Sequence, residues 1–186
     1  CYIPIGHNSS ACIKKEIVIK KLKTLLEDKS VKKIGQNIKF DFIVLNNHGI
    51  EMSSMEDTML MSYVLDAGKN RHNMDTLSEI HLNHKTISFK ELVGSGKNQI
   101  NFNEVELNKA MEYAAEDADI TYRLYKIFNK NLKLEKLTNI YEIFEKPLIK
   151  ILAFMEIKGI KVDNKFLEKL SIKFKKKIKD LEKEIF

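Results

Sequence analysis

The sequence predicts an α/β fold for its first seventy residues and a mostly helical continuation. Short apolar runs bounded by turn residues alternate there with stretches whose apolar residues recur at helical spacing. Strands that alternate with helices pair in parallel, because each helix carries the chain back to the starting edge of the sheet. After Gly68 helical patterns dominate. The 186 residues suffice for one α/β domain, or for one domain and part of another.

The elements of the α/β part follow from this alternation. They are a strand over 2–5, a helix over 16–26, a strand over 31–35, a helix over 36–46, a strand over 50–55 and a helix over 59–67. Pro4 confines the first strand to a sheet edge, because proline has no amide hydrogen to donate to a ladder. Gly49 stops the second helix, since glycine adopts positive φ without a steric penalty.

The helical part follows by the same periodicity. Helices are predicted over 74–82, 88–92, 103–130 and 137–158, with a last one after residue 163. Asp163 is the expected N-cap of that last helix. Pro147 fits its helix only near the start or at a kink. We place the domain boundary after the long helix, so that residues 1–134 form one domain and 135–186 begin another.

Composition excludes several classes of protein. With 44% hydrophobic and 31% charged residues, the chain is neither disordered, nor collagen-like, nor a disulfide scaffold. It has no apolar run of the ~18 to 20 residues that span a bilayer, so we expect no membrane partner. Cys1 and Cys12 offer at most one bridge and no metal-ligand spacing, and we interpret both as reduced thiols.

The net charge of +6 is concentrated near the C-terminus. Residues 158–186 hold ten lysines against five acidic residues, while the rest of the chain is nearly neutral. The last helix combines an apolar stripe with a cationic face that includes Lys173, Lys175, Lys176 and Lys177. By charge alone, a solvated lysine face is the expectation.

A first chemical constellation lies in the long helix. Tyr113 and Asp117 are four residues apart and therefore share one face. A carboxylate beside a phenol can bind a metal and orient its water, although an acidic helix surface would have the same pattern. Glu116 and Asp119 point elsewhere around the helix and are expected to be exposed.

A second constellation follows the strand over 31–35. Asn37 and Asp41 are also four residues apart, near the carboxyl end of the sheet, where α/β proteins place their sites. Taken alone, Asn37 could be an N-cap and Asp41 a charge that favours the helix dipole.

Together the two constellations resemble the second and third motifs of DEDDy-type 3′→5′ exonucleases, in the version found in bacterial family A DNA polymerases. The segments that carry the resemblance are Lys33-Ile-Gly-Gln-Asn-Ile-Lys-Phe-Asp41, Glu56-Asp-Thr-Met-Leu60, Arg71-His-Asn-Met-Asp75, His84-Lys-Thr-Ile-Ser-Phe89, Gly96-Lys-Asn-Gln99 and Tyr113-Ala-Ala-Glu-Asp-Ala-Asp119. The resemblance continues through Glu145-Lys-Pro-Leu148 and Met155-Glu-Ile-Lys-Gly-Ile-Lys-Val-Asp163, which is similar to the beginning of a polymerase domain. It covers nearly the whole chain.

The resemblance implies a fold and a set of roles. The fold is a ribonuclease H-like exonuclease domain without its first strands, followed by the helical start of a polymerase thumb. Asp41 and Asp117 are implied as metal ligands and Tyr113 as the group that positions the attacking water. Two Mg²⁺ ions would act about 4 Å apart, with Mn²⁺ or Zn²⁺ as substitutes.

Substrate contacts are implied at three further positions. Phe89 corresponds to a family position where an aromatic ring stacks on the 3′-terminal bases, and Asn37 to a residue near the substrate. Arg71 could reach a phosphate. For Phe89 a place in the core is an open alternative, and we expect structural roles for His81 and His84.

One departure from the family is decisive for activity. The first exonuclease motif, Asp-x-Glu, does not occur in the first fifty residues, and the chain is expected to begin after it. We therefore expect little exonuclease activity from this chain alone.

The leading interpretation is a piece of a bacterial DNA polymerase with a proofreading domain, monomeric and cytosolic. Its partner would be DNA, with a single-stranded 3′ end at the exonuclease site and duplex primer-template near the basic last helix. The alternatives are a stand-alone exoribonuclease like ribonuclease D, which should lack the polymerase-like continuation, and a catalytically dead exonuclease-like domain that only binds DNA.

Overall fold

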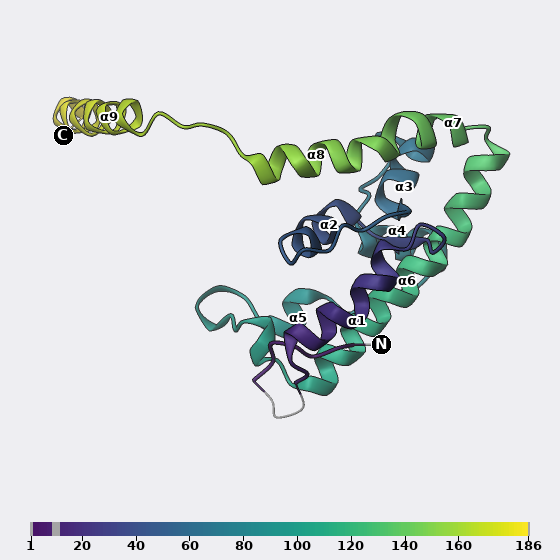
Figure 1. The fold of residues 1–186 in the computed structure, drawn as a ribbon. Helices are drawn as coiled ribbons and strands as arrows, with labels where there is room; N and C mark the ends of the chain where they lie inside the picture. Colours follow the sequence, from purple (N-terminus) through teal and green to yellow (C-terminus); the bar gives the residue numbers. More distant parts are fainter. Residues whose placement is uncertain (1, 9–11, 186) are drawn as a thin grey trace. The chain divides into compact units, whose positions relative to one another are not determined.

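The computed structural model describes residues 2–8 and 12–185 (Figure 1). They belong to two compact units, Cys1–Phe154 and Met155–Phe186. The thiol predicted at Cys1 lies outside the described residues. Cys12 is a free thiol whose Sγ donates to the His7 carbonyl at 3.1 Å, as expected for a reduced cysteine.

The described residues contain one small parallel sheet. Strands β1 (Lys33–Gly35) and β2 (Met55–Asp57) pair with Lys33 opposite Met55 and Gly35 opposite Asp57. This confirms the predicted parallel pairing, although β2 begins at the last residue of the range 50–55. Both carboxyl ends lie at one edge of the sheet, and helices α2 and α3 begin there.

The strand predicted over 2–5 is wrong for the described residues, which form an irregular segment. Its backbone groups bond to neighbouring loops: the Pro4 carbonyl accepts from the Ile13 amide at 2.9 Å, and the Asn8 amide donates to the Asn103 carbonyl at 3.0 Å. These bonds satisfy backbone groups that a ladder would otherwise have used.

Helices make up most of the fold. They are α1 (Lys15–Glu27), α2 (Ile38–Asn46), α3 (Thr58–Asp66), α4 (Met74–Leu82), α5 (Phe89–Val93), α6 (Leu107–Leu134), α7 (Thr138–Ile140), α8 (Lys146–Lys158) and α9 (Asn164–Ile185), with short helical turns η1 (Gly96–Asn98), η2 (Phe102–Glu104) and the π-helical η3 (Tyr141–Glu145). Gly49 follows α2 with φ of 74°, as predicted. Asp57, which was not predicted as a cap, caps α3 by accepting from the Met59 amide.

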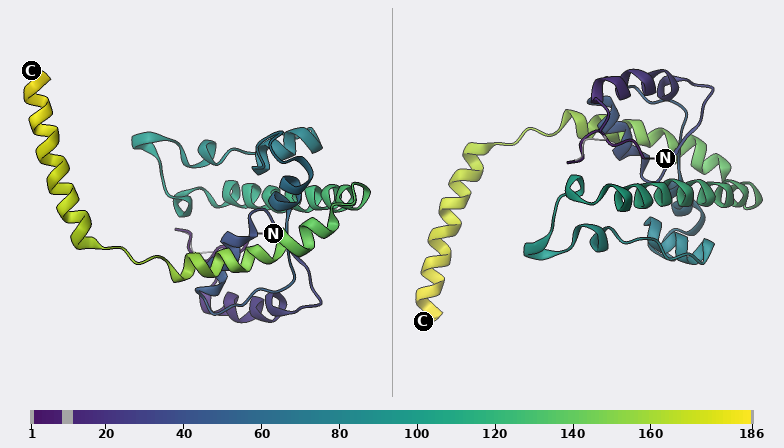
Figure 2. Two further views of the ribbon diagram at one scale, coloured as in Figure 1. Left: turned by 90° about the horizontal axis from the view of Figure 1, so that it is seen from above. Right: turned by 90° about the horizontal axis from the view of Figure 1, so that it is seen from below.

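The long helix α6 organises the first unit (Figures 1 and 2). It packs against α3, α4 and β1. The main core forms there from apolar side chains of α3, α4, α6 and η3, all at most 2% exposed: Met61, Leu77, Ile120, Leu124, Phe128, Leu132 and Tyr141. This packing fixes α6 beside the sheet and so sets the position of the residues on its N-terminal half.

A second core joins α2 to the start of α8. Phe42 of α2 is fully buried, and it packs with Ile149 and Ala153 of α8 in the same cluster. The Phe42 and Phe154 rings meet edge to face with centroids 5.6 Å apart. The helix that carries Asp41 is therefore held from both sides, by the sheet and by α8.

Two predicted helices differ in detail. The helix predicted over 103–130 begins at Leu107, because Asn101 and Glu104 form a capping box around the separate turn η2. The helix predicted over 137–158 is interrupted by the π-helical η3. Pro147 lacks the amide that would bond to the Ile143 carbonyl, and it takes the second position of α8.

In the second unit, α9 follows the loop after α8. The Asp163 side chain accepts from the Phe166 amide at 3.0 Å, which confirms the predicted N-cap. The apolar stripe of α9 is largely exposed within the described residues. No helix in the described part of the chain is long and apolar enough to cross a membrane.

Candidate active site

A cavity opens at the carboxyl end of the sheet, between α2 and α6. Its volume is about 490 Å³, and both Asp41 and Asp117 line it. Asp41 lies on the first turn of α2, and Asp117 lies near the middle of α6. The remaining walls come from β1, α1, α4 and α6, among them Ile34, Gln36, Met74 and Thr121. The fold thus brings together two carboxylates that are 76 residues apart in the sequence.

Tyr113 contacts one of these carboxylates directly. It lies one turn before Asp117 on α6, and its hydroxyl donates a hydrogen bond to that carboxylate. Burial and the neighbouring Asp117 charge raise the pKa of Tyr113 to about 12. The phenol therefore stays protonated at neutral pH and remains a hydrogen-bond donor beside the cavity.

The two carboxylates differ in exposure: Asp117 is half-buried, whereas Asp41 is exposed. Burial raises the pKa of Asp117 to about 6, and the charges of Glu116 and Asp75 add to the rise, against the hydrogen bond from Tyr113. Asp41 lines the cavity, but partial desolvation by the surrounding protein raises the pKa of its carboxyl. The charge of Asp57 adds to this rise. A cation between Asp41 and Asp117 would offset this cost, because it stabilises the charged form of both groups.

The first turn of α2 is held by Asp57, for which no separate role was predicted from the sequence. The Asp57 carboxylate accepts from the Asn37 amide at 3.1 Å, from the Ile38 amide at 3.0 Å and from two amides of α3. One carboxylate thus caps two helix N-termini, a favourable arrangement for a negative charge. An Asp directly before an apolar helical run is an N-cap signal for α3. Nothing in the sequence indicates that the same side chain also caps α2.

Asn37 occupies the N-cap position of α2 in a left-handed conformation, with φ of 58°. The predicted capping role falls to Asp57 instead, since its side chain accepts from the first amides of the helix. Gly35 allows this tight turn: a Cβ there would lie 2.9 Å from Ile38 Cγ1. Asn37 itself is exposed at the edge of the sheet.

Arg71 lies on the exposed loop before α4. His72, the next residue on this loop, is held close to the cavity, because its carbonyl accepts from the side-chain amide of Gln36 at 2.8 Å. The His72 ring also bonds to the Ser62 hydroxyl of α3 at 2.9 Å. Arg71 therefore belongs to a loop anchored beside the start of α2.

Phe89 belongs to an aromatic group next to Tyr113. Phe89, Phe102 and Tyr113 have ring centroids 6.1 Å apart in every pair, and Phe89 and Phe102 are stacked. Phe89 is 46% exposed, which disagrees with the alternative of a core residue. Phe102, on η2, was not singled out from the sequence, where nothing distinguishes it from a core phenylalanine.

Glu116 is not the exposed residue that we expected. Its carboxylate accepts from the Ile87 amide at 2.7 Å and bonds to His84 Nε2 at 2.7 Å, because the segment before α5 crosses α6 at this point. Asp119 is exposed as predicted and pairs with Arg123 at 3.5 Å. His84 and His81 have the expected structural contacts, the latter edge-on to Phe128 with centroids 4.9 Å apart.

The donor set fits a divalent cation of the magnesium type. Carboxylate oxygens are the ligands that Mg²⁺ prefers, and the cavity presents two carboxylates, with no histidine or cysteine among the described residues that line it. Within the described residues, no group of three or more acidic, histidine or cysteine side chains could hold a metal by itself. Asp41 and Asp117 could therefore provide only part of a coordination shell.

Comparison with known proteins identifies the family. A family model described as 3′-5′ exonuclease matches residues 1–133. The chain therefore belongs to the 3′-5′ exonuclease family of the A-type DNA polymerases.

The relatives with similar sequences are DNA polymerases of one kind. DNA polymerase I of Rhizobium leguminosarum is 48% identical over 166 residues, which cover 89% of this chain and 16% of that protein. DNA polymerase I of Pseudomonas aeruginosa is 35% identical over 192 residues, 100% of this chain and 21% of that protein. The chain is thus similar to the exonuclease part of DNA polymerase I, and it spans about a fifth of the length of these relatives. They favour the polymerase interpretation over the ribonuclease D-like and DNA-binding alternatives.

A solved structure supports the fold. The polymerase domain of Pol1 from M. smegmatis, in complex with DNA primer-template and dNTP, superposes with a TM-score of 0.70. The match covers 92% of this chain and 27% of that one, at 21% identity. This match concerns the fold alone; with the family match over residues 1–133, the chain comprises an exonuclease domain followed by a helical region.

Proposed function

We propose that this chain is the proofreading part of a DNA polymerase I, with a ribonuclease H-like exonuclease domain that hydrolyses the 3′-terminal phosphodiester of single-stranded DNA. The single observation that carries this proposal is the shared cavity of Asp41 and Asp117, with Tyr113 bonded to Asp117 at its edge. Asp41 and Asp117 would hold Mg²⁺, with Mn²⁺ or Zn²⁺ as substitutes. When bound, the metal supplies Lewis-acid activation of water and stabilises charge on the leaving 3′ oxygen.

The residues of the chain have separate tasks in this proposal. Tyr113 keeps its proton at neutral pH, so its hydroxyl can hold the attacking water in one orientation without titrating. Phe89, exposed beside Tyr113, offers a ring on which a terminal base can stack. Asn37 and Arg71 lie at the edge of the sheet and on the adjacent loop, where they could contact the terminal nucleotide and a phosphate.

The whole protein would extend primers on a DNA template in the bacterial cytosol, as a monomer, and remove mismatched 3′ ends. Residues 1–134 would form the exonuclease domain, and residues 135–186 the linker helix and thumb base of the polymerase. The lysines of α9 would contact the phosphates of the duplex primer-template.

Metal binding by the 186-residue chain tests the site. We expect the chain to bind Mn²⁺, measured by the electron paramagnetic resonance of the free ion, and Asp41→Ala or Asp117→Ala to weaken binding at least about tenfold, since each removes a ligand. Asp119→Asn is the matched control, because it removes an exposed carboxylate two residues from Asp117. Equal Mn²⁺ affinity in the wild type and in both alanine variants would reject the site.

Digestion of a 5′-labelled single strand tests the activity. With two carboxylates at the site, we expect slow Mg²⁺-dependent shortening from the 3′ end at most, and none in Asp117→Ala. Digestion that persists in Asp117→Ala would show that another group performs the reaction. Rapid digestion by the wild-type chain would instead overturn our expectation that it is nearly inactive alone.

A further inference from the structure

A buried tyrosine outside the cavity is bonded to the strand next to it. Tyr141 of η3 is 1% exposed, and its hydroxyl makes two hydrogen bonds to β2. It donates to Glu56 Oε2 at 3.0 Å and accepts from the Asp57 amide at 2.9 Å. The hydroxyl therefore has both a donor and an acceptor role in one place, where water does not reach.

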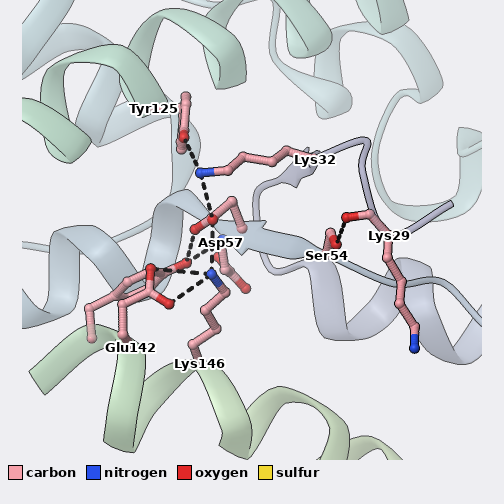
Figure 3. A network of polar contacts seen from close by, with 9 residues as sticks. Lys29, Lys32, Ser54, Asp57, Tyr125, Glu142 and Lys146 are labelled. Atoms are coloured by element: carbon pink, nitrogen blue, oxygen red, sulfur yellow. Dashed lines mark hydrogen bonds and ion pairs between the residues drawn. The ribbon is translucent and has the colours of Figure 1, made fainter. Parts of the chain in front are cut away.

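Glu56 does not depend on this hydroxyl for charge compensation. Its carboxylate, 4% exposed, pairs with Lys146 at 2.9 Å and with Lys32 at 3.3 Å. Lys146 pairs in turn with Glu142, and Lys32 Nζ lies 3.4 Å from the Tyr125 hydroxyl (Figure 3). Two lysines thus compensate the charge of the buried Glu56 carboxylate. The contact that depends on Tyr141 alone is therefore the hydrogen bond that its hydroxyl accepts from the Asp57 amide.

Asp57 is the link from this bond to the cavity. Its side chain, 1% exposed, caps α2 through the Asn37 and Ile38 amides, and Asp41 follows one turn later on the same helix. The capping carboxylate can hold α2 in one place only if the Asp57 backbone is itself fixed. The pairing of β2 with β1 holds this backbone from one side, and the bond from the Asp57 amide to the Tyr141 hydroxyl, 84 residues away in the sequence, holds it from the other.

We propose that Tyr141 is a positioning residue for the metal site: by fixing Asp57, it sets the place of α2 and of the Asp41 carboxylate opposite Asp117. This inference rests on the proposed function for its metal readout. The family-matched region ends at residue 133. Tyr141 follows this region, so a segment outside it would take part in the geometry of the exonuclease site.

The test is Tyr141→Phe in the full chain, because phenylalanine keeps the ring in the core and removes only the hydroxyl. We expect Mn²⁺ affinity to fall about fivefold, the effect of about one hydrogen bond. The matched control is Tyr125→Phe, which removes another hydroxyl at the edge of the Glu56 network and should leave Mn²⁺ affinity unchanged. Unchanged affinity in Tyr141→Phe, or an equal loss in both variants, would overturn the proposal.

A second readout separates this inference from the proposed function. We expect hydrogen exchange at the Asn37 and Ile38 amides to become at least about fivefold faster in Tyr141→Phe but not in Tyr125→Phe, with no metal present. If the wild type fails to bind Mn²⁺, the proposed function fails, and the exchange rates still decide whether Tyr141 holds α2. Faster exchange everywhere to the same degree would indicate a general loss of stability and would reject the positioning role.

Discussion

The charged Asp117 carboxylate destabilises the folded chain, and in the proposed function it binds a metal. It is half-buried, its nearest ionisable neighbours include the acids Glu116 and Asp75, and its pKa is raised to about 6. The Tyr113 hydroxyl offsets only part of this cost. A carboxylate kept in such surroundings is typical of a functional site, since stability alone would favour a neutral residue there.

Without metal, we predict that Asp117→Asn stabilises the chain at pH 7 but hardly at about pH 3.5. The pKa of Asp117 is raised from 3.8 to about 6 on folding, so the folded state binds the proton more tightly, and stability is lost as pH rises from about 4 to about 6. The side chain is only half-buried, and solvent screening limits the gain to about 1 kcal/mol, a few degrees in Tm. Thermal melts in EDTA at both pH values measure it. A gain that is equal at both pH values, or that also occurs in Asp119→Asn, would contradict the prediction.

Residues of the site could be predicted where their partners are close in sequence. Tyr113 and Asp117 are one helical turn apart, so spacing alone places them on one face, and the structure adds the bond between them. Asp57 and Tyr141 could not be predicted in this way. Their bond joins a strand to a turn 84 residues later, and no local pattern encodes such a pairing.

At the scale of elements, α6 does more than present Tyr113 and Asp117. Glu116, on its inner side, holds the segment that leads into α5, through the Ile87 amide and the His84 ring. Phe89 begins α5 two residues later, beside the Tyr113 ring. The helix thus carries the Asp117 carboxylate and the Tyr113 phenol, and through Glu116 it supports the segment that carries the Phe89 ring.

We predict that Glu116→Gln loosens α5 and leaves α6 in place. Glutamine has one neutral acceptor oxygen where the carboxylate has two charged ones, so the Ile87 amide and the His84 ring lose a charged acceptor and share one fewer acceptor oxygen, at a cost of about 1 to 2 kcal/mol. Hydrogen exchange should become faster for residues 87–93 and stay unchanged within α6. Glu112→Gln, at an exposed position of the same helix, is the control. Equal exchange rates for residues 87–93 in the wild type and Glu116→Gln would reject this role.

The elements themselves show which sequence signals are reliable. The helix over 74–82 was predicted with its observed bounds, because apolar spacing and turn residues agree there. The strand over 2–5 was wrong, since an apolar run becomes a strand only if another strand pairs with it. Pro147 was expected near a helix start or at a kink, and it is the second residue of α8, but no pattern in the sequence indicates the π-helical η3 before it.

At the scale of the whole molecule, charge is divided between the two units. Residues 158–186 carry ten lysines and five acidic residues, and they lie in the unit Met155–Phe186. The lysine face of α9 is exposed, so phosphates can approach it. The acidic cavity belongs to the other unit. This division agrees with the proposal that one unit contacts the phosphates of a duplex while the other holds a metal.

We predict that duplex DNA binding depends on the lysines of α9 beyond their contribution to net charge. Changing Lys173, Lys175, Lys176 and Lys177 to Gln should weaken binding of a primer-template duplex, measured by fluorescence anisotropy. Each phosphate contact contributes about −0.9 to the slope of log affinity against log salt, so the slope should become less steep by about 3 to 4. The matched control changes four exposed lysines of the first unit, Lys15, Lys20, Lys21 and Lys29, to Gln and lowers the net charge equally. If the control loses as much affinity and slope as the α9 variant, the attraction comes from net charge alone, and α9 is not the duplex-binding surface.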